Sequence, residues 1–129
     1  MRYIDLKVYS TDIRTEKQLD YNRVPITSGS INDIACRFEF SEHWQDLGTI
    51  IAVFKGSGNT RAVLVIDNTA IIPEECLLSP NSELFVGLIG TGDGGPNLEY
   101  IRQVTTEYIS LGVIVEGASF EGINDTPTQ

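Results

Sequence analysis

Apolar and polar side chains alternate with a period of two along several stretches of the chain. Residues 3–9 place Ile4, Leu6 and Val8 on one face and charged residues on the other, and residues 33–40 repeat the pattern. A period of two is the spacing of side chains along one face of a β-strand, whereas a helix repeats every 3.6 residues. The chain is therefore expected to fold into strands, because no stretch keeps a convincing helical period with caps at both ends.

Three further segments, 49–54, 62–66 and 84–89, are apolar on both faces. Such runs are typical of strands that are covered on both sides. Together, these segments predict about seven or eight short strands at the spacing that β-sandwiches show. The expected fold is an all-β, immunoglobulin-like antiparallel β-sandwich over residues 1–117, followed by a polar C-terminal tail or linker over residues 118–129.

The apolar positions of the strands predict the core. Residues 108–115 also alternate, which directs Ile109, Leu111, Val113 and Val115 to one side. The expected core residues are Ile4, Leu6, Val8, Ile34, Cys36, Phe38, Ile50, Ala52, Phe54, Val63, Val65, Leu84, Val86, Leu88, Ile109, Leu111 and Val113.

Turn residues separate the predicted strands. Gly56-Ser57-Gly58-Asn59 predicts a hairpin whose loop adopts positive φ. Pro73 followed by two acidic residues predicts a short helical turn over residues 73–78. Residues 41–44 are the second candidate for a single helical turn.

The composition excludes some classes of partner. The chain has 18 acidic and 9 basic residues, which gives a formal charge of −9. This charge repels nucleic-acid phosphates and anionic lipid surfaces, so neither is an expected partner. No apolar run reaches the ~18–20 residues of a membrane span, so no membrane insertion is expected. Asp5 and Lys7 interrupt the apolar stretch that a signal peptide needs, which predicts synthesis in a cytoplasm and no export through a secretory signal.

The two cysteines are expected to be reduced. Cys36 and Cys76 lie outside any CxxC pair, and Cys36 falls within an apolar alternation. A buried thiol behaves as a small hydrophobic side chain, and cytoplasmic disulfides are rare. A disulfide between the two is therefore the less favoured alternative.

A glycine-rich segment is the candidate interaction loop. Residues 90–95 match G-x-G-x-x-G, but Pro96 and a segment rich in β-branched residues follow instead of the helix that a dinucleotide site requires. We interpret the segment as a long hairpin loop. The residues of this candidate loop are Gly92, Asp93, Gly94, Gly95, Pro96 and Asn97.

The sequence offers no catalytic, metal or cofactor site. His43 is the only histidine, which is too few for a zinc site with two scattered cysteines, and no nucleophile stands at a persuasive spacing from it. The loop acids do not follow the spacing of a calcium loop, and the side chains of the adjacent Glu74 and Glu75 diverge. The chain is therefore not expected to be an enzyme.

The candidate surface aromatics are Tyr3, Tyr9 and Trp44. Exposed aromatic rings can form a platform for a sugar or a protein partner. Trp44 stands just before a core strand, and the preferred interpretation is that it closes one end of the sandwich.

Several segments occur in a characteristic order. They are Asn22-Arg23-Val24-Pro25-Ile26, Trp44, the hairpin at 56–59, Ile71-Ile72-Pro73-Glu74-Glu75-Cys76-Leu77, Leu84-Phe85-Val86-Gly87-Leu88-Ile89-Gly90 and Val104-Thr105-Thr106. This order resembles small β-sandwich domains of the tail and baseplate modules of phages and prophages of Gram-positive bacteria, and it is similar to the N-terminal domain of phage baseplate upper proteins. Residues 125–128 are similar to the linker that leads into a helical, trimeric distal region in such proteins. The resemblance spans nearly the whole chain and carries no catalytic motif.

The resemblance implies a non-enzymatic structural module of a phage or prophage tail or baseplate. Its expected partners are other tail or baseplate proteins, with a homo-oligomer as a further expectation. Its expected location is the bacterial cytoplasm during assembly and then the tail or baseplate of the virion. Edge strands and the loop at 92–97 would make the contacts. The alternative function is a carbohydrate-binding module that recognises bacterial cell-wall glycans through exposed Tyr and Trp side chains.

Overall fold

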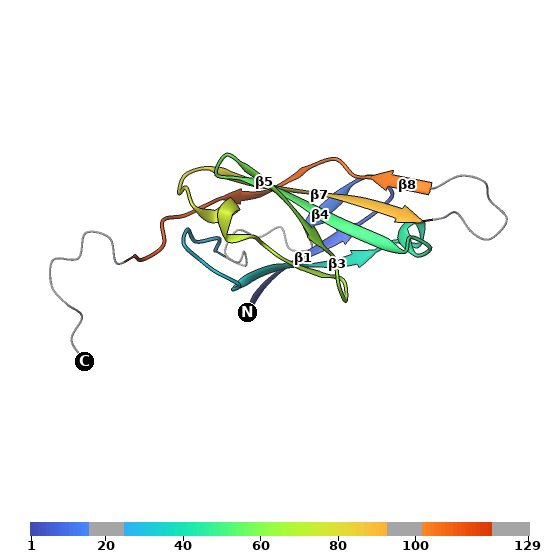
Figure 1. Ribbon diagram of the computed structural model, residues 1–129, viewed down its shortest axis with the longest axis horizontal. Coiled ribbons are helices and arrows are strands. Elements are labelled where there is room, and N and C mark those ends of the chain that lie inside the picture. The colour runs from blue at the N-terminus through green and yellow to red at the C-terminus, as the bar shows by residue number, and fades with distance from the viewer. Residues whose placement is uncertain (16–24, 93–101, 120–129) are drawn as a thin grey trace, which may run out of the picture.

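The computed structural model describes residues 1–15, 25–92 and 102–119, and these residues form a two-layer β-sandwich (Figure 1). The all-β prediction is confirmed, with nine strands in the described residues rather than seven or eight. Two of the nine, β2 (Ile13–Thr15) and β6 (Thr69–Ile71), have three residues each. A strand of that length is too short for alternation to reveal it in the sequence.

The first sheet has the strand order β2-β1-β3-β6. Strand β1 (Arg2–Val8) pairs antiparallel with β2 but runs parallel to β3 (Ile34–Phe40). This pair corrects the expectation of a wholly antiparallel sandwich. Parallel neighbours need a crossover of a dozen or more residues, and residues 9–33, which include β2, separate β1 from β3 in the chain. Opposite charges also match across the pair, because Arg37 Nε donates to Asp5 Oδ1 at 2.6 Å.

The second sheet has the strand order β5-β4-β7-β8, and β9 also pairs with β7. All of its pairings are antiparallel. The strands are β4 (Thr49–Gly56), β5 (Asn59–Leu64), β7 (Glu83–Gly92), β8 (Arg102–Thr105) and β9 (Ile109–Val113). The predicted hairpin joins β4 to β5, with positive φ at Ser57 (55°) and Gly58 (76°).

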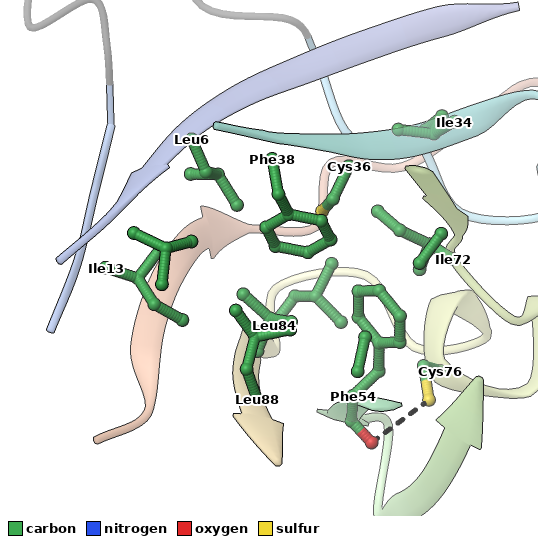
Figure 2. Packing of buried hydrophobic residues seen from close by; sticks show 14 of the residues in the cluster. Leu6, Ile13, Ile34, Cys36, Phe38, Phe54, Ile72, Cys76, Leu84 and Leu88 are labelled. Atoms are coloured by element: carbon green, nitrogen blue, oxygen red, sulfur yellow. Dashed lines mark hydrogen bonds between the residues drawn. The ribbon is translucent and has the colours of Figure 1, made fainter. Parts of the chain in front are cut away.

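The core lies between the two sheets. Side chains from both layers converge there, including Phe38 from the first sheet and Phe54 and Leu84 from the second (Figure 2). Ten of the predicted core residues are fully buried, and six others pack partly buried against them. The buried ten are Leu6, Val8, Ile34, Cys36, Phe38, Ala52, Phe54, Leu84, Val86 and Leu88. The partly buried six are Ile4, Ile50, Val63, Val65, Ile109 and Leu111.

The core prediction was wrong at Val113. Val113 is 54% exposed, and Ile114 is fully buried in its place. The cause is a β-bulge in β9, where Ser110 pairs with Phe85 but Gly112 pairs with Leu84. One extra residue in a bulged strand moves every following side chain to the opposite face, so the alternation after the bulge is reversed.

The two predicted helical turns are present as short 3-10 helices, η2 (Glu42–Trp44) and η3 (Glu74–Leu77). Trp44, in η2, is 1% exposed, and its Nε1 donates a hydrogen bond to the Tyr9 carbonyl oxygen at 2.7 Å. Its assignment as a surface aromatic was therefore wrong, whereas the interpretation that it closes one end of the sandwich is confirmed. In the described part of the chain, no helix is long and apolar enough to cross a membrane.

Residues after β9 tie the two layers together. Val115 forms a parallel bridge with Thr27, and Ser28 N donates to the Val115 carbonyl at 2.8 Å. Gly117 N then donates to Ser28 Oγ at 2.9 Å. In the described part of the chain, these contacts carry the sandwich as far as Gly117, and residues 120–129 of the predicted tail lie outside the described residues.

Candidate functional site

The outer face of the first sheet carries charged side chains that pair across strands. Besides the Asp5–Arg37 pair, Lys7 Nζ lies 3.9 Å from Glu39 Oε2. These four residues alternate with the core residues of β1 and β3, so their side chains point away from the second sheet. A sheet with one face in water is expected to be polar on that face. The first sheet therefore has the ordinary surface of a solvated layer.

The outer face of the second sheet is largely uncharged, with mostly apolar side chains in its two middle rows and hydroxyl and amide side chains in its first row, and we call it the apolar face. The strand registers place its residues in four rows that cross β5, β4, β7 and then β8 or β9. The rows are Thr49–Thr91–Gln103, then Leu64–Ile51–Ile89–Thr105, then Ala62–Val53–Gly87, and last Thr60–Lys55–Phe85–Ser110. The first three rows contain no charged residue, which is the reverse of the pattern on the first sheet.

Among the described residues, charge appears only at one end of the apolar face. Lys55 lies in the last row, and Glu83 begins β7 beyond it, paired with Val113. The Lys55 ammonium is 4.2 Å from the centroid of the Tyr108 ring. The Tyr108 ring in turn covers Gly87, because a Cβ at Gly87 would lie 3.0 Å from Tyr108 Cδ1. Tyr108, 46% exposed, therefore forms a raised feature in the third row.

The side chains of the apolar face are accessible. Leu64 is 53% exposed, and Ile51, Val53, Phe85 and Ile89 are half-buried. Isolated apolar residues on a surface are ordinary, but a contiguous apolar patch marks an interaction surface. The sequence contained the signal, since β4, β5 and β7 coincide with the runs predicted to be covered on both sides. The first sheet covers them on the inner side only.

The predicted interaction loop is described at its first residue only. Gly92 ends β7 and is half-buried. Residues Asp93, Gly94, Gly95, Pro96 and Asn97 lie outside the described residues. The loop therefore stays a prediction.

The two other candidate aromatics are exposed, but each has a guanidinium group on its ring. Tyr3 is 38% and Tyr9 40% exposed. Arg37 lies 4.4 Å from the centroid of the Tyr3 ring, and Arg14 lies 4.7 Å from that of Tyr9. Cation–π contacts of this kind occupy the ring face on which a sugar would stack.

His43 lies in a small polar cluster rather than beside a nucleophile. Arg102 Nη2 donates to the His43 carbonyl at 2.8 Å, and its Nη1 donates to Asp46 Oδ1 at 2.7 Å. The contacts link η2 to the start of β8, so Arg102 holds the end of the sandwich together. Among the residues that the structure describes, no group of three or more His, Cys, Asp or Glu side chains could hold a metal ion.

A pocket of about 370 Å³ opens between the sheets next to η2. Its lining residues are Phe38, Glu39, Phe40, Trp44, Gln45, Leu47, Ile50 and Asn68. An open sheet edge can accept an extended peptide by strand pairing. Here Phe38 N already donates to the Asn68 carbonyl at 2.7 Å, and Gln45 Nε2 donates to the Phe40 carbonyl at 3.2 Å. These partners occupy the backbone groups that an added strand would use.

Both cysteines are free and buried; burial was predicted for Cys36 only. Burial raises the pKa of the Cys36 thiol far above its ordinary value, and burial is also the main cause of a raised pKa at Cys76. Cys76 Sγ–H points to the carbonyl oxygen of Phe54 at 3.7 Å, as Figure 2 shows. A thiol held in its protonated form is a poor nucleophile and a poor metal ligand. Neither cysteine therefore has the chemistry of a reactive site.

Comparison with protein-family models, with curated proteins and with solved structures finds no match for this chain.

Proposed function

We propose that this chain is a non-enzymatic structural module of a phage or prophage tail or baseplate, which assembles with other proteins of the particle through the apolar face. The observation that carries the proposal is the difference between the two outer surfaces. One sheet shows charges that are paired across strands, and the other shows three rows without charge.

The chemistry of the apolar face supports a protein partner. Burying apolar surface contributes about 25 cal/mol for each Å² removed from water, and no complementary charges are required. Interfaces between proteins have cores depleted of charged side chains and enriched in aromatic ones, with charge at the rim. The apolar face has this composition, with Tyr108 inside it and Lys55 and Glu83 at one end.

The phage context is supported by the order of segments in the sequence. Two elements of that order have structural counterparts that position the apolar face. The hairpin at residues 56–59 joins β4 to β5, and the segment at residues 84–90 forms the centre of β7. Assembly into a virion would require a surface of this kind, because a small sandwich has no deep cleft and acts through its faces and edges.

The glycan-binding alternative has less support. A sugar platform needs an aromatic ring with an open face. Tyr3 and Tyr9 are each capped by an arginine, and Trp44 is buried. We therefore favour the protein-assembly function.

The proposed function is tested in particles. Prophage particles from cells that encode the chain would be purified after induction, and the chain would be located by immunogold labelling and quantified by mass spectrometry. We expect labelling at the tail or baseplate. Particles that lack the chain, from cells in which the chain is expressed, would refute the phage assignment.

A pair of matched variants tests the role of the apolar face. Leu64→Glu places a charge on the face, and Leu78→Glu changes a residue of the same type and similar exposure (60% against 53%) next to η3. We expect Leu64→Glu to lower incorporation at least about tenfold and Leu78→Glu to leave it unchanged. Equal incorporation of both variants would show that assembly uses another surface.

A further inference from the structure

We infer that the occupant of the apolar face is a second copy of this chain, packed face to face about a two-fold axis that runs along the strands between β4 and β7. The inference rests on the proposed function, since it names the partner of the same surface. It follows from the charge, the area and the shape of the face.

Charge favours self-association on this face. The chain carries a net charge of −9, so two copies repel each other on average. The first three rows of the apolar face contain no acid, and face-to-face packing therefore brings no like charges together at its centre. The first sheet, in contrast, would place two sets of ion-paired charges in contact and would desolvate both.

The charges at the rim of the apolar face, Lys55 and Glu83, are self-complementary about this axis. Rotation about an axis between β4 and β7 places β4 of one copy over β7 of the other. Lys55 of one copy then lies over Phe85 of the other, one row from Glu83. Rows are about 7 Å apart, a distance that a lysine side chain spans. The Lys55 ammonium, which lies 4.2 Å from the Tyr108 ring of its own copy, turns away from that ring to form this pair. Because the arrangement is isologous, the same pair forms twice.

The shape of the apolar face is also self-complementary. Tyr108 rises on the β7 side of the third row, over Gly87. The same row on the β4 side holds the smaller Val53 and Ala62. The two-fold rotation exchanges these sides, so that the ring of each copy meets the lower region of the other. Central aromatic anchors in such positions supply much of the affinity of protein interfaces.

The area is sufficient for a dimer. Strands about 4.8 Å apart and rows about 7 Å apart give four strands and four rows a projected area of roughly 500 Å². Side-chain relief adds to this projection, so two copies would bury roughly 1,000–1,300 Å² in total. Specific interfaces begin at about 1,200 Å², which predicts a dimer that dissociates in the micromolar range rather than an obligate one.

Sedimentation equilibrium of the full chain between about 1 and 200 µM tests the inference. We expect the mass to rise from 14.2 kDa to twice that value. Leu64→Glu should raise the dissociation constant at least about 100-fold, while Leu78→Glu should leave it within threefold. Circular dichroism and a cooperative thermal transition would confirm that each variant folds. A wild-type chain that stays monomeric at 200 µM, or equal effects of the two variants, would overturn the inference.

Charge reversal tests the two-fold arrangement itself. Lys55→Glu alone and Glu83→Lys alone each place like charges at both rim pairs, so each should dimerise at least about tenfold more weakly. An equimolar mixture should restore the dimer, because both rim pairs then join a glutamate to a lysine. A mixture that associates no better than the separate variants would exclude this axis.

The outcomes separate this inference from the proposed function. A monomeric chain whose incorporation into particles still depends on Leu64 would refute self-association and keep the assembly surface. A dimer sensitive to Leu64→Glu, from a chain absent from particles, would refute the phage assignment and keep the dimer.

Discussion

Replacement of Gly90 by alanine tests how the single tryptophan closes the sandwich. Gly90 lies on the inner face of β7, under the indole of Trp44. A Cβ at this position would lie 2.7 Å from Trp44 Cζ3 and 2.6 Å from Leu47 Cδ1. Carbon atoms in proteins pack at about 3.5–4.0 Å, so the neighbours would have to move by about 1 Å.

The indole cannot move freely, and this determines how strongly Gly90→Ala destabilises the protein. Trp44 is 1% exposed, and its Nε1 is held by the Tyr9 carbonyl at 2.7 Å. Overpacking a core costs about 1–3 kcal/mol, whereas alanine in place of glycine restores about 0.5–1 kcal/mol of backbone entropy. We therefore expect Gly90→Ala to lower the free energy of unfolding by about 1–2 kcal/mol, or roughly 4–8 °C in Tm.

The assay is urea unfolding followed by tryptophan fluorescence and by far-UV circular dichroism. Trp44 is the only tryptophan, so its emission reports the environment of this one ring. Gly48→Ala is the matched control, because no atom lies within 4 Å of a Cβ there. We expect Gly48→Ala to leave stability unchanged or to raise it by a few tenths of a kcal/mol.

A double variant identifies the contact responsible. Trp44→Phe removes part of the indole, so the cost of Gly90→Ala should be smaller in the Trp44→Phe background than in the wild type. Because this background has no tryptophan, unfolding is followed there by circular dichroism alone. Additive effects of the two changes, or a Gly90→Ala variant as stable as Gly48→Ala, would refute the packing argument.

Three further predictions concern the chain end and the thiols. Gly117→Ala should lower the free energy of unfolding by about 1–3 kcal/mol in urea titrations, because its Cβ would collide with the Ser28 carbonyl oxygen; wild-type stability would exclude that contact. Native protein at pH 8 should react with Ellman's reagent at fewer than about 0.1 thiols per chain, and with two thiols after denaturation, because Cys36 and Cys76 are buried; rapid native reaction would contradict their burial. Stability should fall above pH 9, the ordinary thiol pKa, because the unfolded chain ionises Cys36 and the folded chain does not. The slope that Cys36 adds is about 1.4 kcal/mol per pH unit. Cys36→Ala should lose this part and keep only the contribution of Cys76, whose pKa is also raised, and equal slopes for the two proteins would refute the argument.

The sequence was sufficient to predict which side chains face inward along most strands. Leu6, Cys36 and Phe38 belong to alternations of period two, and a β-strand presents every second side chain to the same face. It was also sufficient for local turns, since the positive φ at Ser57 and Gly58 follows from residue types that are adjacent in the chain. Such features depend on neighbours a few residues away.

The bulge in β9 shows a feature that the sequence pattern could not predict. The pattern of residues 108–115 continues without interruption, yet Val113 faces solvent and Ile114 enters the core. The extra residue is accommodated at Gly112, whose φ is 114°. Pairing with β7 selected this arrangement, and the partner strand begins more than twenty residues earlier.

The apolar face likewise has one property that the sequence determined and another that only the tertiary structure decided. The sequence by itself determined that segments 49–54, 62–66 and 84–89, which overlap β4, β5 and β7, are apolar on both faces, because side-chain type is a local property. Only the tertiary structure decided which side the first sheet covers and that Leu64, Val53 and Tyr108 share the other. The parallel pairing of β1 with β3 and the burial of Trp44 were decided there too. A period of two specifies the face of a strand but not its neighbour, and neighbours are selected by contacts between distant parts of the chain.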